Sequence, residues 1–323
     1  MRLVAVAPNP SIDRLLELDR LVRDAVNRPL VETLVAGGKG LNVARAAHAL
    51  GAEATVVALL AGHAGAWMAD ALETEGIAGR FAWAGGETRT CIAIHDRADG
   101  TLTEVNEAGP EVDRSTWRGL VELLRAEIAA GDVELVTISG TLPPGVPPDG
   151  LAELARVARE GDVAVALDAA GSPLAAALGT TPWLVKLNAA EARATLGDEG
   201  AALTPGSTDD EAEALALARR IAARSAGAVV VTRGAEGALA IDADGSAFRV
   251  GAASIRGPYP VGSGDAFLAG LAVGRLRGSS IGDSLGLAGA AAAANALTRG
   301  AGRLDPADVA RLGSSILVES LAV

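Results

Sequence analysis

From about residue 130 onward, short apolar runs alternate with longer segments that have the periodicity of helices. The helical segments cover residues 150–160 and 209–226. Together with one run near the N-terminus, the apolar runs predict buried strands: Leu3–Ala7, Leu135–Ser139, Val163–Asp168, Trp183–Leu187 and Ala228–Thr232. Strands that are apolar along their whole length are typical of a parallel sheet covered by helices on both faces. The pattern therefore predicts an α/β fold with its ligands at the carboxyl ends of the strands.

Two segments, residues 10–36 and 86–107, depart from this pattern because polar and apolar residues alternate along them. Within the second segment, Thr88–Ile94 and Thr101–Val105 predict two strands joined by a turn at Asp99-Gly100. Such alternation is typical of an antiparallel sheet with one face toward water. Inserted into an α/β body, this sheet is a candidate lid.

The chain has no internal repeat and no linker long enough to separate two domains. We therefore expect residues 1–323 to form one domain into which the two lid segments are inserted. The neighbourhood of Gly206 and Ser207, near residues 200–210, is expected to be a flexible surface loop.

Composition narrows the class of protein and of partner. Half of the 323 residues are hydrophobic and 2% are aromatic, so the core must be built from aliphatic side chains. A net charge of −12 without a basic run disfavours nucleic acid and anionic membrane as partners, so a few local Arg and Lys residues must bind any anionic substrate. Cys91, the one cysteine, cannot form an internal disulfide and fits a reducing compartment. With no signal pattern and no apolar run of membrane-spanning length, a cytoplasmic protein is expected.

The segment Gly262-Ser263-Gly264-Asp265 leads into a run of small, apolar residues that predicts a helix. Glycines allow a tight turn whose amides point at one spot, and a helix N-terminus adds partial positive charge. The segment therefore suits a phosphoryl group in transfer. A carboxylate at this place is either a general base that deprotonates an attacking hydroxyl or a residue that caps the helix.

Two other glycine motifs are excluded by their spacing. A dinucleotide fingerprint beginning at Gly262 would need glycine at the position of Phe267. A Walker loop around Lys39 would need glycine in place of Thr33 and a hydroxyl residue in place of Gly40. A nucleotide must therefore be bound by another scheme.

Five segments in chain order resemble motifs of the PfkB/ribokinase family of carbohydrate kinases: Asn9–Asp13, Gly37–Ala44, Asn188–Glu191, Thr232–Gly237 and Gly262–Asp265. The resemblance covers nearly the whole chain. It implies a ribokinase-like three-layer α/β/α sandwich with a mostly parallel central sheet and a small β-sheet lid. It also implies ATP and Mg²⁺ as cofactors, and a homodimer paired through the lids.

The resemblance implies roles for individual residues. Asp265 would be the catalytic base, beside an anion hole formed by the amides of Gly262, Ser263 and Gly264. The sugar would be bound by Asp13, Gly37, Gly38, Asn42 and Ser139. On the nucleotide side the implied residues are Lys186, Asn188, Thr232, Gly234, Gly237 and Asn295, although core packing explains Asn295 equally well. Glu191 would order magnesium through water.

Further segments resemble the branch of the family that phosphorylates sugar phosphates, which includes 1-phosphofructokinase, tagatose-6-phosphate kinase and the minor 6-phosphofructokinase. These segments are Asn27-Arg28, Lys39, Thr88-Arg89, Asn106–Pro110 and Ser139–Gly145. Because guanidinium pairs bidentately with phosphate, Arg28 and Arg89 are candidates, with Lys39, to hold the phosphate that the substrate already carries. Fructose 1-phosphate is the expected substrate and fructose 1,6-bisphosphate the product, with tagatose 6-phosphate and fructose 6-phosphate next.

Two other functions stay open at this point: a kinase for an unphosphorylated sugar or nucleoside, and a non-catalytic sugar-phosphate sensor. The chain also departs from the common family pattern at Leu187, at Tyr259-Pro260 and at Ser263. Because Tyr259-Pro260 precedes the glycine turn, where relatives place a monovalent-cation loop, activation by such a cation is left open.

Overall fold

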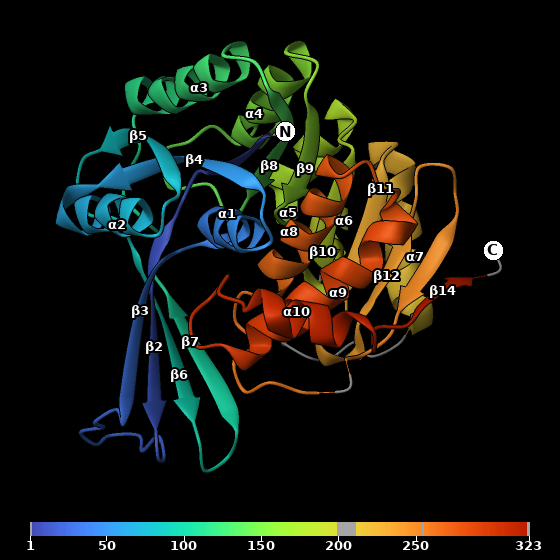
Figure 1. Ribbon diagram of the computed structural model, residues 1–323. Coiled ribbons are helices and arrows are strands. Elements are labelled where there is room, and N and C mark those ends of the chain that lie inside the picture. The colour runs from blue at the N-terminus through green and yellow to red at the C-terminus, as the bar shows by residue number, and fades with distance from the viewer. Residues whose placement is uncertain (1, 199–210, 254, 322–323) are drawn as a thin grey trace.

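Ten strands form the larger of two sheets in the computed structural model, which describes residues 2–198, 211–253 and 255–321 (Figure 1). In spatial order they are β14 (Val318–Leu321), β13 (Ala247–Val250), β12 (Ala238–Ile241), β11 (Ala228–Thr232), β10 (Leu184–Asn188), β9 (Ala164–Asp168), β8 (Val133–Ser139), β1 (Arg2–Ala7), β4 (Glu53–Ala61) and β5 (Ala78–Ala84). Neighbours from β5 to β11 run parallel, whereas β11 to β14 pair antiparallel. The predicted mostly parallel sheet is confirmed. The expected loop around Gly206 and Ser207 lies outside the described residues.

Helices cover both faces of this sheet. One layer consists of α1 (Lys39–Ala49), α2 (Gly62–Thr74), α8 (Ser263–Leu276), α9 (Ile281–Leu297) and α10 (Pro306–Gly313). The other consists of α3 (Arg114–Ala129), α4 (Gly150–Glu160), α5 (Gly171–Ala177), α6 (Ala189–Leu196) and α7 (Glu211–Ser225). Successive β1 residues alternate between the two cores, with Leu3 in one and Val4 in the other. The predicted three-layer α/β/α sandwich is confirmed.

Small residues let the helix that begins at the glycine turn lie close to its neighbour. A Cβ atom at Gly270 of α8 would lie 2.5 Å from the Ala288 Cα atom of α9, and one at Gly274 would lie 2.2 Å from the Ser284 hydroxyl. The alanine and glycine residues along this pair therefore allow close packing of α8 against α9, which fixes the position of α8 on the sheet. Among the described helices, none is both long enough and apolar enough to cross a membrane.

The small sheet projects from the body as a separate blade (Figure 1). Its strands, in spatial order, are β3 (Val31–Gly37), β2 (Ser11–Leu18), β6 (Thr90–Asp96) and β7 (Thr101–Asn106). The two hairpins are antiparallel as expected, but β2 and β6, which join them, run parallel. The reason is that β2 and β6 continue outward from β1 and β5, two parallel strands of the large sheet.

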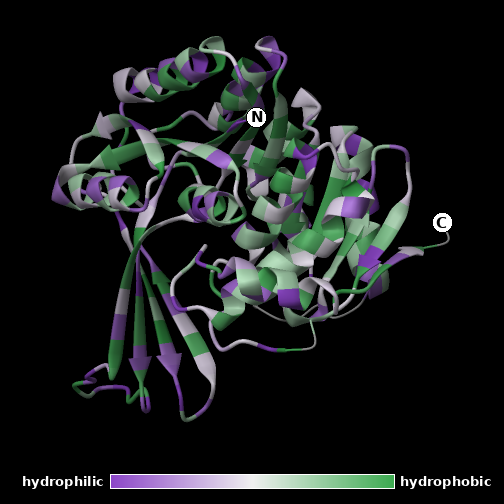
Figure 2. Cartoon of the chain, in the orientation of Figure 1, coloured by the Kyte–Doolittle hydropathy of each residue, from purple (hydrophilic) through white to green (hydrophobic). Residues whose placement is uncertain are grey.

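The two faces of the small sheet differ in what they contact. Asp13 and Glu17 share the inner face, where Glu17 accepts hydrogen bonds from Arg299 Nε at 2.6 Å and from the Tyr259 hydroxyl at 3.3 Å. The strand register places five apolar side chains together on the outer face: Leu16, Leu34, Ile92, Ile94 and Val105. Figure 2 shows the resulting alternation of hydrophobic and hydrophilic bands along these strands.

Candidate active site

The candidate sugar-binding residues lie where the small sheet joins the body. Asp13 Oδ1 accepts a hydrogen bond from the Ser11 hydroxyl at 2.6 Å, and Oδ2 accepts one from the Gly38 amide at 3.2 Å. Gly38 has a φ of +85° at the start of α1, and a Cβ atom at Gly37 would lie 2.1 Å from Asp13 Oδ2. Burial raises the pKa of Asp13, against the lowering effect of its hydrogen bonds. Glycine at position 37 therefore leaves the space that the Asp13 carboxylate occupies.

Asp265 is buried in the first turn of α8 and accepts a hydrogen bond from Asn42 Nδ2 at 2.8 Å. Burial, and then the charge of Asp168, raise the pKa of Asp265 to about 7, although Lys186, Lys39 and the Asn42 hydrogen bond act in the opposite direction. A carboxylate with such a pKa can take up a proton near neutral pH, which is what a general base requires.

Four charged side chains form a cluster beside Asp265. The Lys39 ammonium donates to Asp168 Oδ1 and to Glu191 Oε1, each at 2.7 Å, and Lys186 Nζ donates to Asp168 Oδ2 at 2.7 Å. Burial would raise the pKa of Asp168, but Lys186 and Lys39 hold it below its ordinary value. Lys39 therefore faces two carboxylates, and binding a phosphate would require it to share its charge with them.

The glycine turn before α8 has the geometry of an anion site. Gly262 adopts the left-handed conformation with a φ of +84°, and a Cβ atom there would lie 2.7 Å from the Ala301 Cα atom. A Cβ atom at Gly264 would lie 2.9 Å from Lys186 Nζ, so this ammonium sits against the first helical turn. The Ser263 amide donates to the Pro260 carbonyl at 3.1 Å, whereas the amide of Gly264 has no acceptor within the helix.

Asn295 supports this turn from inside the protein. It is fully buried, donates through Nδ2 to the Val261 carbonyl at 2.9 Å and to the Ser263 hydroxyl at 3.2 Å, and accepts from the Gly302 amide at 2.8 Å. The structure thus places Asn295 beneath the anion turn. For Asn295 to contact adenine, it would have to exchange these hydrogen bonds for a bond to the base.

The other nucleotide-side candidates gather at the carboxyl ends of β10 and β11. Asn188 and Thr232 are register partners on these strands, and Asn188 and Glu191 form a reciprocal capping box at the start of α6. Gly234 and Gly237 follow β11 with φ values of +58° and +87°. A Cβ atom at Gly237 would lie 2.0 Å from the Val250 carbonyl oxygen, so only glycine fits there.

The structure places the other sugar-side candidates in different surroundings. Arg89 lies at the base of the small sheet, where it donates to the carbonyls of Asn9 and Glu107. Ser139 ends β8 opposite Asp168, and its buried hydroxyl has no hydrogen-bond partner within the described chain. Arg28 is exposed in the loop between β2 and β3, at the end of the small sheet farthest from Gly37, so one subunit does not bring it to Asp265.

Two groups of residues were missed by the sequence reasoning. Asp168 ends a predicted strand at its carboxyl end, a position that could have marked it as a candidate. Tyr259 contacts the small sheet through Glu17 and lies edge-on to His95, with ring centroids 6.4 Å apart, while the Arg299 guanidinium lies 5.3 Å from its ring centroid. No short-range signal in the sequence indicates these long-range contacts.

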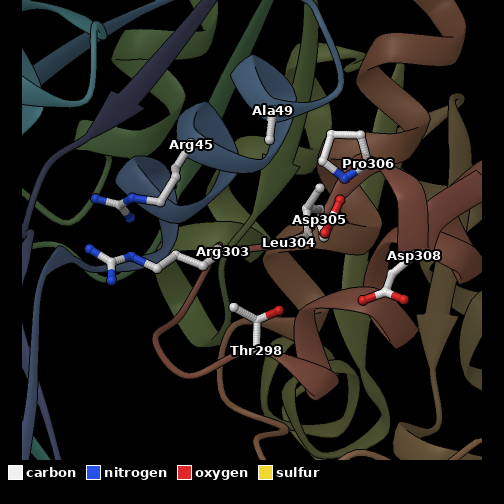
Figure 3. A pocket seen from close by; sticks show the side chains of 9 residues that line it. Arg45, Ala49, Thr298, Arg303, Leu304, Asp305, Pro306 and Asp308 are labelled. Carbon is white, nitrogen blue, oxygen red and sulfur yellow. The ribbon is translucent and has the colours of Figure 1, made fainter.

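A cavity of about 580 Å³ lies between α1 and the segment 298–308 (Figure 3). Its lining residues are Arg45, Ala49, Thr298, Gly302, Arg303, Leu304, Asp305, Pro306 and Asp308. Gly302 packs closely against α1 at this cavity, since a Cβ atom there would lie 2.6 Å from the Asn42 Cα atom. In Figure 3 the side chains of Arg45 and Arg303 extend in the same direction, and both pair with Glu75.

The buried Asp265 beside a glycine turn, at the edge of a three-layer α/β/α body, suits an enzyme that transfers a phosphoryl group to a hydroxyl. Residues 7–308 match the family described as pfkB family carbohydrate kinase, and the chain belongs to that family. An enzyme of this class takes its phosphoryl group from ATP.

Individual relatives support the same class. The 1-phosphofructokinase of Haloferax volcanii is 32% identical over 284 residues, which cover 88% of this chain and 87% of that protein. The structure of phosphofructokinase-2 from Escherichia coli in complex with substrates and products has a TM-score of 0.85 at 25% identity, covering 98% of this chain and 99% of that one. A possible 1-phosphofructokinase from Thermotoga maritima has a TM-score of 0.85 at 23% identity over the full length of both chains, a likeness in fold.

Proposed function

We propose that this chain phosphorylates fructose 1-phosphate to fructose 1,6-bisphosphate with ATP. The observation that carries the proposal is the position of Asp265, buried between the sugar-binding turn and the anion-binding N-terminus of α8. The choice of fructose 1-phosphate is supported by the 32% identity to a 1-phosphofructokinase. Tagatose 6-phosphate and fructose 6-phosphate are the next candidates.

In the proposed reaction each residue of the site has a separate role. Asp13 binds sugar hydroxyls, held in place by Ser11 and the Gly38 amide. Asp265 accepts the proton of the attacking hydroxyl as that oxygen bonds to phosphorus and the terminal phosphoryl group of ATP leaves ADP. The first-turn amide of Gly264 and the ammonium of Lys186 stabilise the negative charge of the group in transfer.

The site also fits ATP and Mg²⁺. Thr232, Gly234 and Gly237 lie at the strand ends where a nucleotide is expected, and Lys186 supplies positive charge beside the anion turn. Within the described residues no three His, Cys, Asp or Glu side chains are grouped to hold a metal ion. Mg²⁺ is commonly held by one or two carboxylates, by water and by substrate phosphates, and Glu191 would act through such water. When bound with ATP, the ion neutralises phosphate charge.

The substrate's own phosphate requires cations away from Asp265. Arg89 is the candidate within the subunit, because it lies at the base of the small sheet near Asn9. Arg28 can contribute only if a second subunit brings its loop to the site. We propose a homodimer in which the outer apolar faces of two small sheets pack together, so that each small sheet acts as a lid on a single kinase domain spanning residues 1–323.

A coupled assay of ADP release over a panel of acceptors tests the proposal. The expected result is a kcat/KM highest for fructose 1-phosphate among the three ketohexose phosphates, ribose, fructose and adenosine. A higher value for a free sugar or a nucleoside would overturn the substrate assignment. Absence of turnover with every acceptor, together with saturable binding of a sugar phosphate, would indicate a sensor. Turnover in potassium against tetramethylammonium buffer decides the monovalent-cation requirement.

A further inference from the structure

The side-chain amide of Asn42 faces the two carboxylates of the site. Its Nδ2 group donates to Asp265 Oδ2 at 2.8 Å, and its hydrogen bond also lowers the pKa of Asp13. An asparagine amide is nearly symmetric in shape, so a rotation of 180° would exchange its oxygen for its nitrogen. With Oδ1 turned toward the carboxylates, their charged forms would lose a donor and face an acceptor. The orientation of one amide therefore affects both the sugar-binding residue and the base.

Arg45 is the group that contacts the opposite side of this amide. It lies one helical turn after Asn42 on α1, is buried, and donates from one terminal nitrogen, Nη1, to Asn42 Oδ1 at 3.3 Å. Guanidinium carries donors and no acceptor, so it matches the Asn42 oxygen and rejects the Asn42 NH₂ group.

Three further contacts hold the Arg45 guanidinium in place. Nε donates to Glu75 at 2.7 Å, Nη2 to the Ala36 carbonyl at 2.6 Å, and Nη1 also to the Ala301 carbonyl at 3.4 Å. These partners come from the C-cap of α2, from β3 just before the sugar-binding turn, and from the segment behind Gly262. If the Asn42 amide rotated, its NH₂ group would face the guanidinium. Arg45 could not move away from it without breaking its hydrogen bonds to Glu75, Ala36 and Ala301.

We propose that Arg45 is a positioning residue that fixes the Asn42 amide with its donor side toward Asp265 and Asp13. This inference rests on the proposed role of Asp265 as base. It predicts that loss of Arg45 frees the amide to rotate, which weakens the donor to both carboxylates without removing any group that contacts the substrate.

Other charged groups around Asp265 also set its pKa, so the effect of Arg45 adds to theirs. Asp168 from β9, Lys186 from β10 and Lys39 from α1 act on it directly, and Glu191 from α6 acts on Lys39. Among the described residues no hydrogen bond or ion pair joins Arg45 to Asp265, so an effect of Arg45 on the base must pass through Asn42 or through its long-range charge, which also lowers the pKa of Asp13 directly.

The pH dependence of kcat/KM in the variant Arg45→Met tests the proposal. Methionine keeps an apolar stem and removes every donor. Losing a hydrogen bond to the charged form raises a carboxyl pKa, so we expect the acid limb to move upward by about one pH unit, with activity recovering toward the parent value at high pH. Arg303→Met is the matched control, because it removes the same charge from the same cavity and the same Glu75 partner without contacting Asn42 (Figure 3). Its acid limb should not move.

A double variant separates the two routes by which Arg45 could act. In an Asn42→Ala background, Arg45→Met should cause no further shift, since the amide is already absent. A limb that stays in place in the single variant, or that shifts equally in both backgrounds or in Arg303→Met, would overturn the proposal. If Arg45→Met does not fold, Arg45→Lys keeps a charge for Glu75, and a smaller shift in the same direction is expected. Retained turnover in Asp265→Asn would instead contradict the base assignment, whatever Arg45 does.

Discussion

At the residue scale, the proposed chemistry depends on carboxylates whose burial is only partly compensated by hydrogen bonds and opposite charges. Asp168 is balanced by two lysines, whereas Asp265 receives one amide hydrogen bond and shares those lysines with Asp168. The first therefore stays ionised while the second can exchange its proton. The contrast separates a structural charge from a reactive one within a single cluster.

Replacing Asp265 with asparagine preserves its size and removes its ability to accept a proton. We expect kcat to fall by about 10²–10⁴-fold, as measured by coupled ADP release. Because the folded-state pKa of Asp265 is raised from 3.8 to about 7, its ionisation lowers stability progressively as the pH rises between these two values, and the full loss is present above the folded-state pKa. Asp265→Asn should consequently melt at a higher temperature than the parent at pH 8. A variant that loses activity and also melts lower would indicate damage to the fold.

The pH dependence of the parent enzyme follows from the same residue. A general base acts in its deprotonated form, so with Asp265 in the proposed role kcat/KM should decrease about tenfold per pH unit below the pKa of Asp265, which lies at about 7. Initial rates between pH 5 and 9 measure this. A profile that stays flat down to pH 5 would exclude Asp265 as the base.

Arg89 should act on the sugar phosphate alone. Charge-assisted hydrogen bonds contribute roughly 1.5–3 kcal/mol, so Arg89→Ala should raise the KM for the phosphosugar about 10- to 100-fold and leave the KM for ATP nearly unchanged. Arg125→Ala is a matched control, since Arg125 pairs with Glu160 on the surface of the body, away from the small sheet. Equal losses for both substrates would show that Arg89 acts through folding.

At the scale of elements, turns place the reactive groups, and glycines permit the turns. Gly37 and Gly262 each stand where a side chain would overlap another part of the site. Both belong to local motifs, which is why the sequence could predict them. The strand Ala228–Thr232 was likewise predicted with its observed bounds, because five consecutive apolar or β-branched residues leave little choice.

Contacts between distant segments could not be predicted in the same way. The parallel pairing of β2 with β6 depends on where the large sheet releases both strands, and the contact of Asn295 with Ser263 spans 32 positions. Asp168 and Arg45 acquire their partners only when several strands and helices meet. Periodicity and motif spacing describe neighbours along the chain, and these partners are neighbours only in space.

Because Gly37 leaves room for Asp13, a methyl group at position 37 should weaken sugar binding more than nucleotide binding. In Gly37→Ala the new Cβ atom would lie 2.1 Å from Asp13 Oδ2, so Asp13 must move and the KM for the sugar should rise at least about tenfold. Gly286→Ala is the control, because its Cβ atom meets nothing within 4 Å on α9 and should add about 0.5–1 kcal/mol of stability. An unchanged sugar KM in Gly37→Ala would contradict the assigned role of Asp13.

At the scale of the whole molecule, the small sheet exposes an apolar face that the body does not cover. Leu34 is 37% exposed and Val105 is 55% exposed, and the strand register places both in one row with Ile92 and with Arg14, whose charge is paired with Glu32. Exposed sheet faces of this kind are usually buried against a partner. Because the inner face already contacts Tyr259 and Arg299, the outer face is the one available to a second subunit.

An unpaired charge in place of an apolar side chain of this row should separate the proposed dimer. Light scattering at micromolar concentration should give about twice the chain mass of 32.2 kDa for the parent and the single mass for Val105→Asp, whose register partner is the apolar Ile92. Leu317→Asp, at an exposed leucine beside β14, should leave the mass unchanged. A parent protein that scatters as one chain with full activity would show that the small sheet works without a partner.

Tyr259 gives the molecule a built-in reporter. It is the one tyrosine of the chain, and its ring touches the small sheet through Glu17 and His95 while its backbone precedes the anion turn. Incorporation of 3-fluorotyrosine would thus place a single ¹⁹F nucleus at the junction between blade and body. Its resonance would follow the movement of the small sheet during ligand titration, without an attached dye or an engineered cysteine.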